Sequence, residues 1–358
     1  MPSTVEEVVQ IGSPSPVRVV REPRLVERVV FIGGHPGSGK TLMTAIVGGL
    51  DRVEMQKYNY ALEHLCGLSF LGRLDEGVTT PLIRMLVDVD LYNMTMARDT
   101  NFRCSDYTSV FRNPGGWRYI RRLFQPGDAA AVERICETHP ILQITVHNIL
   151  AISRPLFQAL GDRVRILEVV RHPLFMMKHW RLYIERYGTD VRDFTIWFDY
   201  QGQALPFFAL GWEEQYVRSN PMDRCIYSIE RLSQLGRQVM ERLSVSQRSQ
   251  VMILPFEPFV LDPWPHLRQL EALLGTRVTA RTRRELKRQR VPRRRIADGI
   301  PLKCYRQYGW EPAKRGLDER DELDRHRQFA AREASAEGLK VLDRLSRDYE
   351  AAYLDGAL

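Results

Sequence analysis

Apolar residues gather in four short runs, which are separated by longer stretches with helical spacing. The runs contain four to seven residues each and lie at Val29–Ile32, Ile141–Val146, Val164–Val170 and Val251–Phe256. Such runs predict buried strands. Between them, apolar spacing typical of helices occupies Leu150–Leu160, Leu174–Tyr187 and Met222–Leu243. Strands that alternate with helices predict parallel βαβ units, so we expect an α/β fold in which helices flank a parallel sheet.

A further helix is predicted between the first two strands. Thr80-Pro81 has the pattern of an N-cap followed by proline at the first helical position, which predicts a helix over Leu82–Met96. Within it, Leu86–Asp90 also fits a strand that ends in a metal-binding Asp. The preceding cap and the long run without a breaker favour the helix.

The chain divides into three predicted parts. Residues 1–27 hold four prolines among Val, Arg and Glu, and we expect an extended N-terminal arm. Residues 28–316 are expected to form one α/β domain. Residues 317–358 carry a charged pattern that predicts one helix over Glu319–Leu354, packed on the domain or extending from it.

An aromatic stretch over Phe194–Tyr216 contains a hairpin pattern that turns at Gln201–Gln203. Its rings fit a platform for a sugar or an aromatic ligand, although such residues more often belong to the core.

The first strand leads into a phosphate-binding loop. Gly34–Thr41 fits the pattern G-x-x-x-x-G-K-[ST] without a mismatch, and the apolar helix Leu42–Val47 follows. Glycines let backbone N–H groups converge on an anion, and the helix adds its positive N-terminal end. Lys40 supplies a mobile charge, and Thr41 supplies a hydroxyl for a phosphate or a metal. A Gly-rich turn that binds nothing is the alternative, but strand, spacing, Lys and Thr together predict a phosphorylated ligand.

A residue whose side chain suits catalysis or ligand binding follows each of the other three strands. His147 is the candidate general base, because the ordinary pKa of a histidine lies near neutrality; a local hydrogen bond is its alternative role. Arg171 can present a fork of donors to a phosphate, or form an ordinary ion pair. Glu257 is expected to organise the end of the sheet rather than to do chemistry.

In this order and spacing, the four segments resemble the sulfotransferase family. Phe31–Met43 is similar to the 5′-phosphosulfate loop, above all to that of tyrosylprotein sulfotransferases. Ile166–Pro173 resembles the strand and R-[DN]-P turn that meet the 3′-phosphate. Ile144–Asn148 occupies the place of the K-T-H-L-P segment with the catalytic histidine of cytosolic members. Leu254–Pro263 is similar to the family's R-Y-E-D-L-x-x-D-P segment, and the resemblance covers residues 28–275.

The resemblance implies a sulfotransferase-like P-loop domain that moves a sulfuryl group from 3′-phosphoadenosine 5′-phosphosulfate (PAPS) to a hydroxyl of a glycan, glycolipid or small metabolite. It implies no metal. His147 and Lys40 take the catalytic positions. The implied cofactor-binding residues are His35, Pro36, Gly37, Ser38, Gly39, Lys40, Thr41, Leu42, Arg171 and His179.

Both implied phosphate clamps depart from the family pattern. Gly37 stands where the family loop has a basic residue, and Lys40 stands at its first Thr. His179 replaces the Ser that follows the arginine turn.

Two other functions are compatible with the sequence. The true Walker-type loop suits an ATP- or GTP-dependent kinase, although no Asp ends the strands at His147, Arg171 or Glu257 as a Walker B partner would. A nucleotide- or nucleic-acid-binding regulator would use the basic run Arg281–Arg295, which is otherwise a solvated face. Glu54, after the loop helix, is a second-choice base.

Composition limits the classes of ligand and the cell compartment that we expect. The 358 residues carry a net charge of +8, which suits anionic ligands. Five scattered cysteines without a C-x-x-C pair indicate reduced thiols and a cytoplasmic protein. The N-terminus lacks a signal-peptide pattern and no run of 18 apolar residues occurs, so no membrane span is expected. No nucleic-acid-binding motif is present, so nucleic acid is not an expected partner, and a homodimer is left open.

Overall fold

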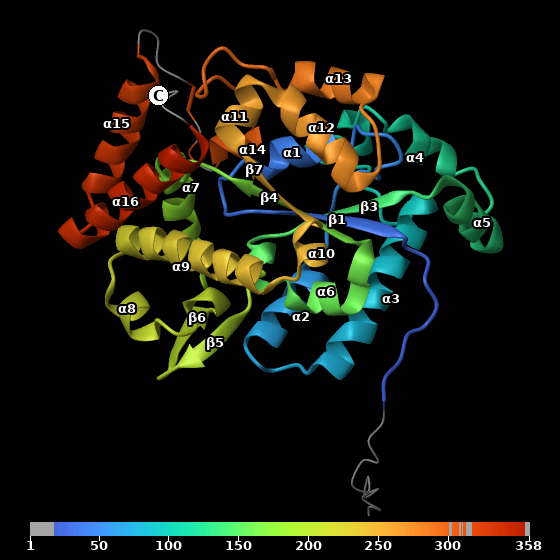
Figure 1. Ribbon diagram of the computed structural model, residues 1–358, viewed down its shortest axis with the longest axis horizontal. Coiled ribbons are helices and arrows are strands. Elements are labelled where there is room, and N and C mark those ends of the chain that lie inside the picture. Colours follow the sequence, from blue (N-terminus) through green and yellow to red (C-terminus); the bar gives the residue numbers. More distant parts are fainter. Residues whose placement is uncertain (1–17, 301–302, 308, 310, 313–316, 355–358) are drawn as a thin grey trace, which may run out of the picture.

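The computed structural model describes residues 18–300, 303–307, 309, 311–312 and 317–354. Its centre is a five-stranded parallel sheet with the strand order β2-β3-β1-β4-β7 (Figure 1). The strands are β1 Arg28–Gly33, β2 Lys57–Tyr58, β3 Ile141–Thr145, β4 Val164–Val170 and β7 Val251–Pro255. The four predicted strands and the parallel α/β fold are confirmed. Strand β2 was not predicted, because two residues carry no readable pattern.

Helices cover both faces of this sheet. Above it in Figure 1 lie α1 Lys40–Val47, α11 Phe256–Leu261, α12 Pro263–Leu274 and α13 Ala280–Arg288. Below it lie α2 Tyr60–Phe70, α3 Glu76–Thr95 and α6 Arg154–Leu160. The remaining helices are α4 Trp117–Arg122, α5 Asp128–Thr138, α7 Pro173–Arg186, α8 Glu213–Arg218, α9 Pro221–Arg242, α10 Val245–Arg248, α14 Lys303–Gln307, α15 Glu319–Ala331 and α16 Ala336–Tyr353. Single 3-10 turns are η1 Val110–Arg112, η2 Ile149–Ile152, η3 Gly161–Arg163 and η4 Phe207–Ala209.

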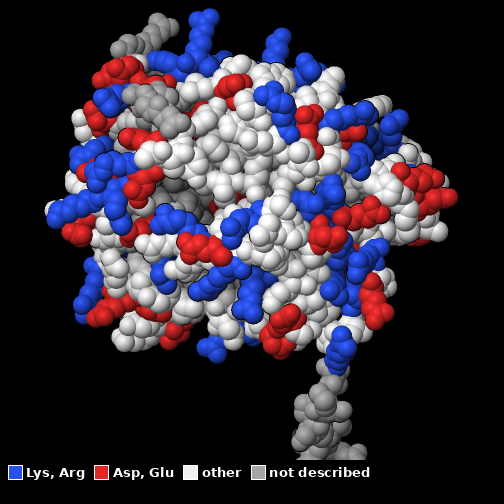
Figure 2. Space-filling model, viewed as in Figure 1, with Lys and Arg blue, Asp and Glu red and all other residues white. Residues whose placement is uncertain are grey.

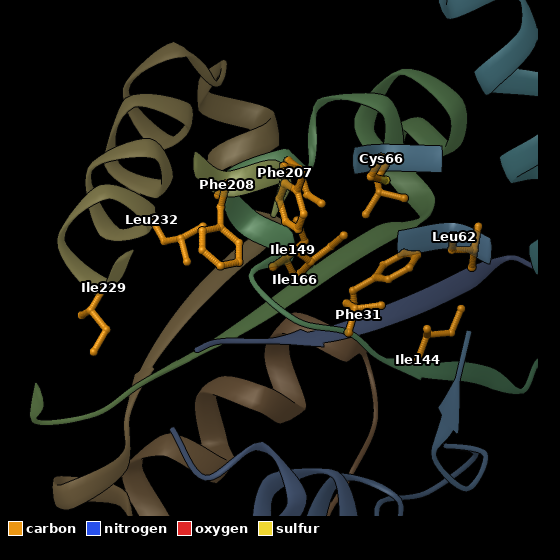
Figure 3. Packing of buried hydrophobic residues seen from close by; sticks show 14 of the residues in the cluster. Phe31, Leu62, Cys66, Ile144, Ile149, Ile166, Phe207, Phe208, Ile229 and Leu232 are labelled. Carbon is orange, nitrogen blue, oxygen red and sulfur yellow. The ribbon is translucent and has the colours of Figure 1, made fainter. Parts of the chain in front are cut away.

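Strand β1 separates two hydrophobic clusters. Its side chains alternate, so Val29 and Phe31 enter the cluster with α2, α3 and α9, whereas Val30 and Ile32 enter the cluster with α1 and α12. Figure 3 shows the first cluster, in which Phe31 lies beside Leu62. Since both faces of the central strand are buried, the loop that follows it starts from a fixed position.

Helix α3 begins earlier than predicted. Asp75, not Thr80, caps it by accepting a hydrogen bond from the backbone N–H of Val78, so that Pro81 lies inside the helix. The helical interpretation of Leu86–Asp90 is confirmed. The predicted helix over 150–160 is interrupted, since a 3-10 turn precedes α6.

The aromatic stretch forms the predicted hairpin. Strands β5 Trp197–Tyr200 and β6 Gln203–Pro206 pair antiparallel, apart from the central sheet. Gln201 and Gly202 both have positive φ, as a tight hairpin turn requires. Phe207 and Phe208 are buried in the core, so this part of the stretch is structural.

The C-terminal segment consists of two helices, so the prediction of a single helix over 319–354 is wrong. Helix α15 ends at Ala331, and Ser335 caps α16 by accepting from the backbone N–H of Gly338. Asp223 of α9 holds the connection, because it accepts a hydrogen bond from the backbone N–H of Ser335. Both helices bury leucines in the core, as Leu323 and Leu342 show. No described helix is long and apolar enough to cross a membrane.

Candidate active site

A cavity of about 410 Å³ opens at the carboxyl ends of the sheet strands. It is lined by the loop and by three side chains singled out from the sequence: His147, Arg171 and His179. The parallel sheet brings them together, because β3 and β4 flank β1 on its two sides and end at the same edge. From the predicted cofactor-binding set, Pro36, Gly37, Gly39, Lys40, Thr41 and Leu42 also line the cavity.

Lys40 crosses the loop from its inner side. Its ammonium donates to the backbone carbonyls of Gly34 at 2.6 Å and His35 at 2.8 Å. An ammonium has three N–H donors, so one remains for a ligand in the cavity that Lys40 also lines. Burial lowers the pKa of Lys40, and the negative charges of Glu168 and Glu63 oppose that shift. Lys40 therefore braces the loop and can neutralise an anion held by it.

His35 and Ser38 lie behind the loop. The ring of His35 contacts Asn148 Oδ1 at 2.8 Å and Ser233 Oγ at 3.1 Å. Burial lowers the pKa of His35 to about 4, so the ring is neutral at pH 7. The Ser38 hydroxyl is buried and has no hydrogen-bond partner among the described residues. The His35 ring thus anchors the loop to the end of β3 and to α9, and neither side chain is on the cavity wall.

His147 is held by the carboxylate of Glu63, which was not among the site residues predicted from the sequence. Its backbone N–H donates to Glu63 Oε2 at 3.2 Å, and its ring Nδ1 lies 3.6 Å from the same oxygen. The ring stacks on Tyr183 with centroids 6.2 Å apart, and it is partly exposed to the cavity. Burial raises the pKa of Glu63, but its hydrogen bonds with His147 and the charge of Lys40 outweigh burial and lower it. An anionic Glu63 therefore fixes the orientation of His147.

Arg171 joins the loop to the end of β7. Its Nη1 donates to the carbonyl of Gly37 at 2.9 Å, and its Nε lies 3.6 Å from Glu257 Oε1. Glu257 also accepts the backbone N–H of His172 at 3.2 Å and the hydroxyl of Tyr349 at 2.5 Å. The expectation that Glu257 organises the end of the sheet agrees with these contacts.

A second arginine completes this corner of the cavity. Arg293 lines the cavity, and its guanidinium lies 5.5 Å from the centre of the Phe256 ring. The guanidinium of Arg171 lies 4.6 Å from the centre of that ring. Burial, followed by the charge of Arg171, lowers the pKa of Arg293 to about 10, and its Nε has no partner among the described residues. Both arginines line the cavity, and guanidinium groups are suited to binding an anion.

Gly37 and His179 lie against each other next to the loop. Gly37 has a φ of +84°, and a Cβ there would lie 3.1 Å from the Cβ of His179. The ring of His179 therefore fills space next to the loop that a side chain at position 37 would need. Burial, followed by the charges of Lys40, His147 and Arg171, lowers the pKa of His179 to about 3. The ring is neutral at pH 7.

Glu168 is a further buried carboxylate, and it lies next to the start of the loop. Glu168 of β4 packs against Gly33, and its Oε2 has no hydrogen-bond partner among the described residues. Burial raises its pKa, while Lys40 opposes the shift. The apolar pattern of β4 gave no reason to expect a buried carboxylate next to the loop.

Glu54, the second-choice base, is removed from the candidates. It is buried and not on the cavity wall, and its two oxygens accept hydrogen bonds from Arg122 at 2.8 and 2.9 Å. The hydroxyl of Tyr119 donates to it at 2.6 Å. Burial raises the pKa of Glu54, but Arg118 and Arg122 reverse this and lower it to about 2. Glu54 is therefore the centre of a structural ion cluster.

The described residues contain no group of three or more His, Cys, Asp and Glu side chains that could hold a metal ion.

No family model matches the chain, and no curated protein matches it either. Among solved structures, the sulfotransferase domain of the Synechococcus PCC 7002 olefin synthase matches with a TM-score of 0.41 and 14% identity, over 87% of this chain and 97% of that one. The sulfotransferase domain from the curacin biosynthetic pathway has a TM-score of 0.40 and 12% identity, over 87% of this chain and 100% of that one. Sulfotransferase STF9 from Mycobacterium avium has a TM-score of 0.38 and 13% identity, over 92% of this chain and 76% of that one. Identities and TM-scores this low do not decide function, which has to come from the residues of the site.

Proposed function

We propose that this chain is a sulfotransferase that moves a sulfuryl group from PAPS to a hydroxyl of an acceptor. The observation that supports the proposal is that three basic residues, Lys40, Arg171 and Arg293, line one cavity. We divide them into two cationic sites. Lys40 and the loop form one site, and Arg171 with Arg293 forms the other. PAPS carries anionic groups at both its 5′ and 3′ positions, so the pair of sites fits it better than a nucleotide with phosphates at one end.

In this proposal, the backbone of residues 35–42 and the Lys40 ammonium hold the 5′-phosphosulfate. Arg171 and Arg293 hold the 3′-phosphate, and the neutral His179 ring packs between the loop and this corner. Arg293 is added here to the set implied by the sequence, and its position on the cavity wall supports that choice. The basic run alone did not distinguish one arginine from the others.

His147 is proposed to act as the general base. The acceptor oxygen attacks sulfur, and the bond between sulfur and the bridging oxygen of the 5′-phosphate breaks. The proton of the hydroxyl passes to His147, while Lys40 stabilises the negative charge on the leaving 3′-phosphoadenosine 5′-phosphate (PAP). Glu63 supports this step, because a carboxylate beside the imidazole stabilises the imidazolium that forms.

A glycan, glycolipid or other small metabolite is the proposed acceptor. Tyr58 and Tyr60 line the same cavity as His147 and are 40% and 41% exposed. Exposed rings of this kind can stack on a sugar. Cys66, Cys104, Cys136 and Cys225 are free, which supports the cytoplasm as the proposed compartment.

Nucleotide binding distinguishes this proposal from the kinase alternative. PAP should raise the melting temperature of the protein in EDTA, because a ligand that binds only the folded state stabilises it. ATP and GTP should raise it less, with or without magnesium. If only ATP with magnesium stabilised the protein, the result would contradict the sulfotransferase proposal and support the kinase.

A further inference from the structure

An exposed surface made of large apolar side chains and arginines lies on the segment around α4 and on α13. Four apolar side chains within residues 111–124 are strongly exposed: Phe111 at 57%, Trp117 at 70%, Leu123 at 52% and Phe124 at 85%. Single exposed apolar residues are normal, but a group of this size marks an interaction site. We call it the α4–α13 surface.

The inner side of α4 explains why these residues point outward. Arg118 and Arg122 are bound to Glu54, and Tyr119 between them is fully buried. The helix is therefore fixed from its inner side. Trp117 and Arg121 lie four residues apart on its exposed side, and the exposed Phe124 follows just after the helix ends.

Helix α13 lies directly beside this segment. Arg288 donates to the backbone carbonyl of Arg112, and a Cβ on Gly115 would lie 3.3 Å from a guanidinium nitrogen of Arg281. Arg281, Arg284 and Arg288 share one face of α13, because they are spaced by three and four residues. Figure 2 shows Lys and Arg side chains gathered over α13 and towards α4.

The exposed charge of α13 is positive. The exposed side chains of α13 include Arg283, Arg284, Lys287 and Arg288. The one carboxylate of the helix, Glu285, is buried. The part of α13 that faces solvent is therefore cationic, and it lies beside the segment that carries Phe111 and Trp117.

We infer that the α4–α13 surface binds the face of a membrane that contains anionic phospholipids. Arginines attract the lipid phosphates, and Trp and Phe side chains enter the interfacial region of a bilayer. Leu123 and Phe124 form an adjacent apolar pair at the end of α4, which suits insertion between lipids better than the stacking of bases. The surface also adjoins the cavity rim, because Tyr107 lines the cavity and Arg288 lies 5.7 Å from the centre of its ring.

Vesicle binding by the full chain tests this inference. The protein should co-sediment with vesicles of phosphatidylcholine and phosphatidylglycerol, and not with phosphatidylcholine alone. Rising salt should weaken the binding. The double variant Arg121→Gln/Arg284→Gln should lose about thirtyfold in affinity, since each basic residue near an anionic surface contributes about fivefold. Phe124→Ser, a change at an almost fully exposed position, should also weaken binding.

Matched substitutions elsewhere on the surface serve as controls. Arg218→Gln/Arg332→Gln removes two exposed charges from α8 and the end of α15, and Val245→Ser removes an exposed apolar side chain from α10. These variants should bind vesicles like the wild type. Equal binding to both vesicle types would overturn the inference. Equal loss in both sets of variants would also overturn it, as would tighter binding of a single-stranded RNA that the same α4–α13 variants abolish.

Discussion

One oxygen of Glu63 lies 3.2 Å from the backbone nitrogen of His147 and 3.6 Å from its ring Nδ1. The carboxylate thus fixes both the end of β3 and the imidazole that the proposed reaction needs. A largely buried carboxylate next to the histidine is the orienting partner that the proposed general base requires.

His147→Ala should lower turnover by about 10²–10⁴, the usual contribution of a positioned acid–base group. PAP affinity should stay nearly unchanged, because the side chain is proposed to face the acceptor. Glu63→Gln should lower kcat by about tenfold or more. If the two residues act as a unit, the double variant should be no slower than His147→Ala. Additive losses in the double variant, or more than about a third of turnover in His147→Ala, would contradict the assignment.

Lys40→Met should weaken PAP binding by about 2–3 kcal/mol, the value of a hydrogen bond to a charged group. Calorimetric titration measures this. Lys178→Met is the control, because Lys178 also lines the cavity but pairs with Glu311. Unchanged affinity in the Lys40 variant would mean that the loop amides hold the 5′ end alone.

Gly37→Ala should destabilise the fold by more than the cost of its positive φ, which is about 1 kcal/mol. The added Cβ would press on His179 at 3.1 Å. Gly72→Ala isolates the backbone cost, since Gly72 also has positive φ and open space around it. Urea unfolding should show a larger loss at position 37. In a His179→Gly background, which removes the contacted Cβ, Gly37→Ala should cost no more than Gly72→Ala. Equal losses at positions 37 and 72 would show that His179 does not fill this space.

Glu54→Gln should destabilise the protein most at neutral pH and progressively less as the solution becomes acidic. The folded pKa of Glu54 is about 2, below the usual 4.5, so its stabilising effect is complete above pH 4.5 and disappears as pH falls towards 2. The shift corresponds to about 3 kcal/mol. Urea unfolding of both proteins at several pH values measures it. Asp343→Asn, from a half-exposed ion pair whose carboxyl pKa is also lowered, is the comparison and should show a smaller dependence on pH. A penalty that does not depend on pH would contradict the charge-based account.

The site residues at the carboxyl edge of the sheet were easier to predict from the sequence than those on the walls of the cavity. Apolar runs locate strands, and a parallel sheet places their ends together, so the loop, His147 and Arg171 were predictable as neighbours. Glu63 and Arg293 were not, because each acts through tertiary contacts with residues more than 80 positions away: Glu63 with His147, and Arg293 with Arg171. Glu54 was misjudged for the same reason, since its arginine partners come from α4.

The break between α15 and α16 was missed because the charged pattern continues across it. The deciding contact is the hydrogen bond from the backbone N–H of Ser335 to Asp223, which belongs to a helix more than 100 residues earlier. Such a contact leaves no local signal in the sequence.

The most direct test of the two-site account compares PAP with adenosine 5′-phosphate by calorimetric titration in EDTA. These ligands differ only in the 3′-phosphate, which Arg171 and Arg293 are proposed to hold. We predict that PAP binds about 100-fold more tightly, as expected for charge-assisted contacts, and that Arg293→Gln removes most of this difference. Equal affinity of the two ligands, or a preference that survives both Arg293→Gln and Arg171→Gln, would contradict the account.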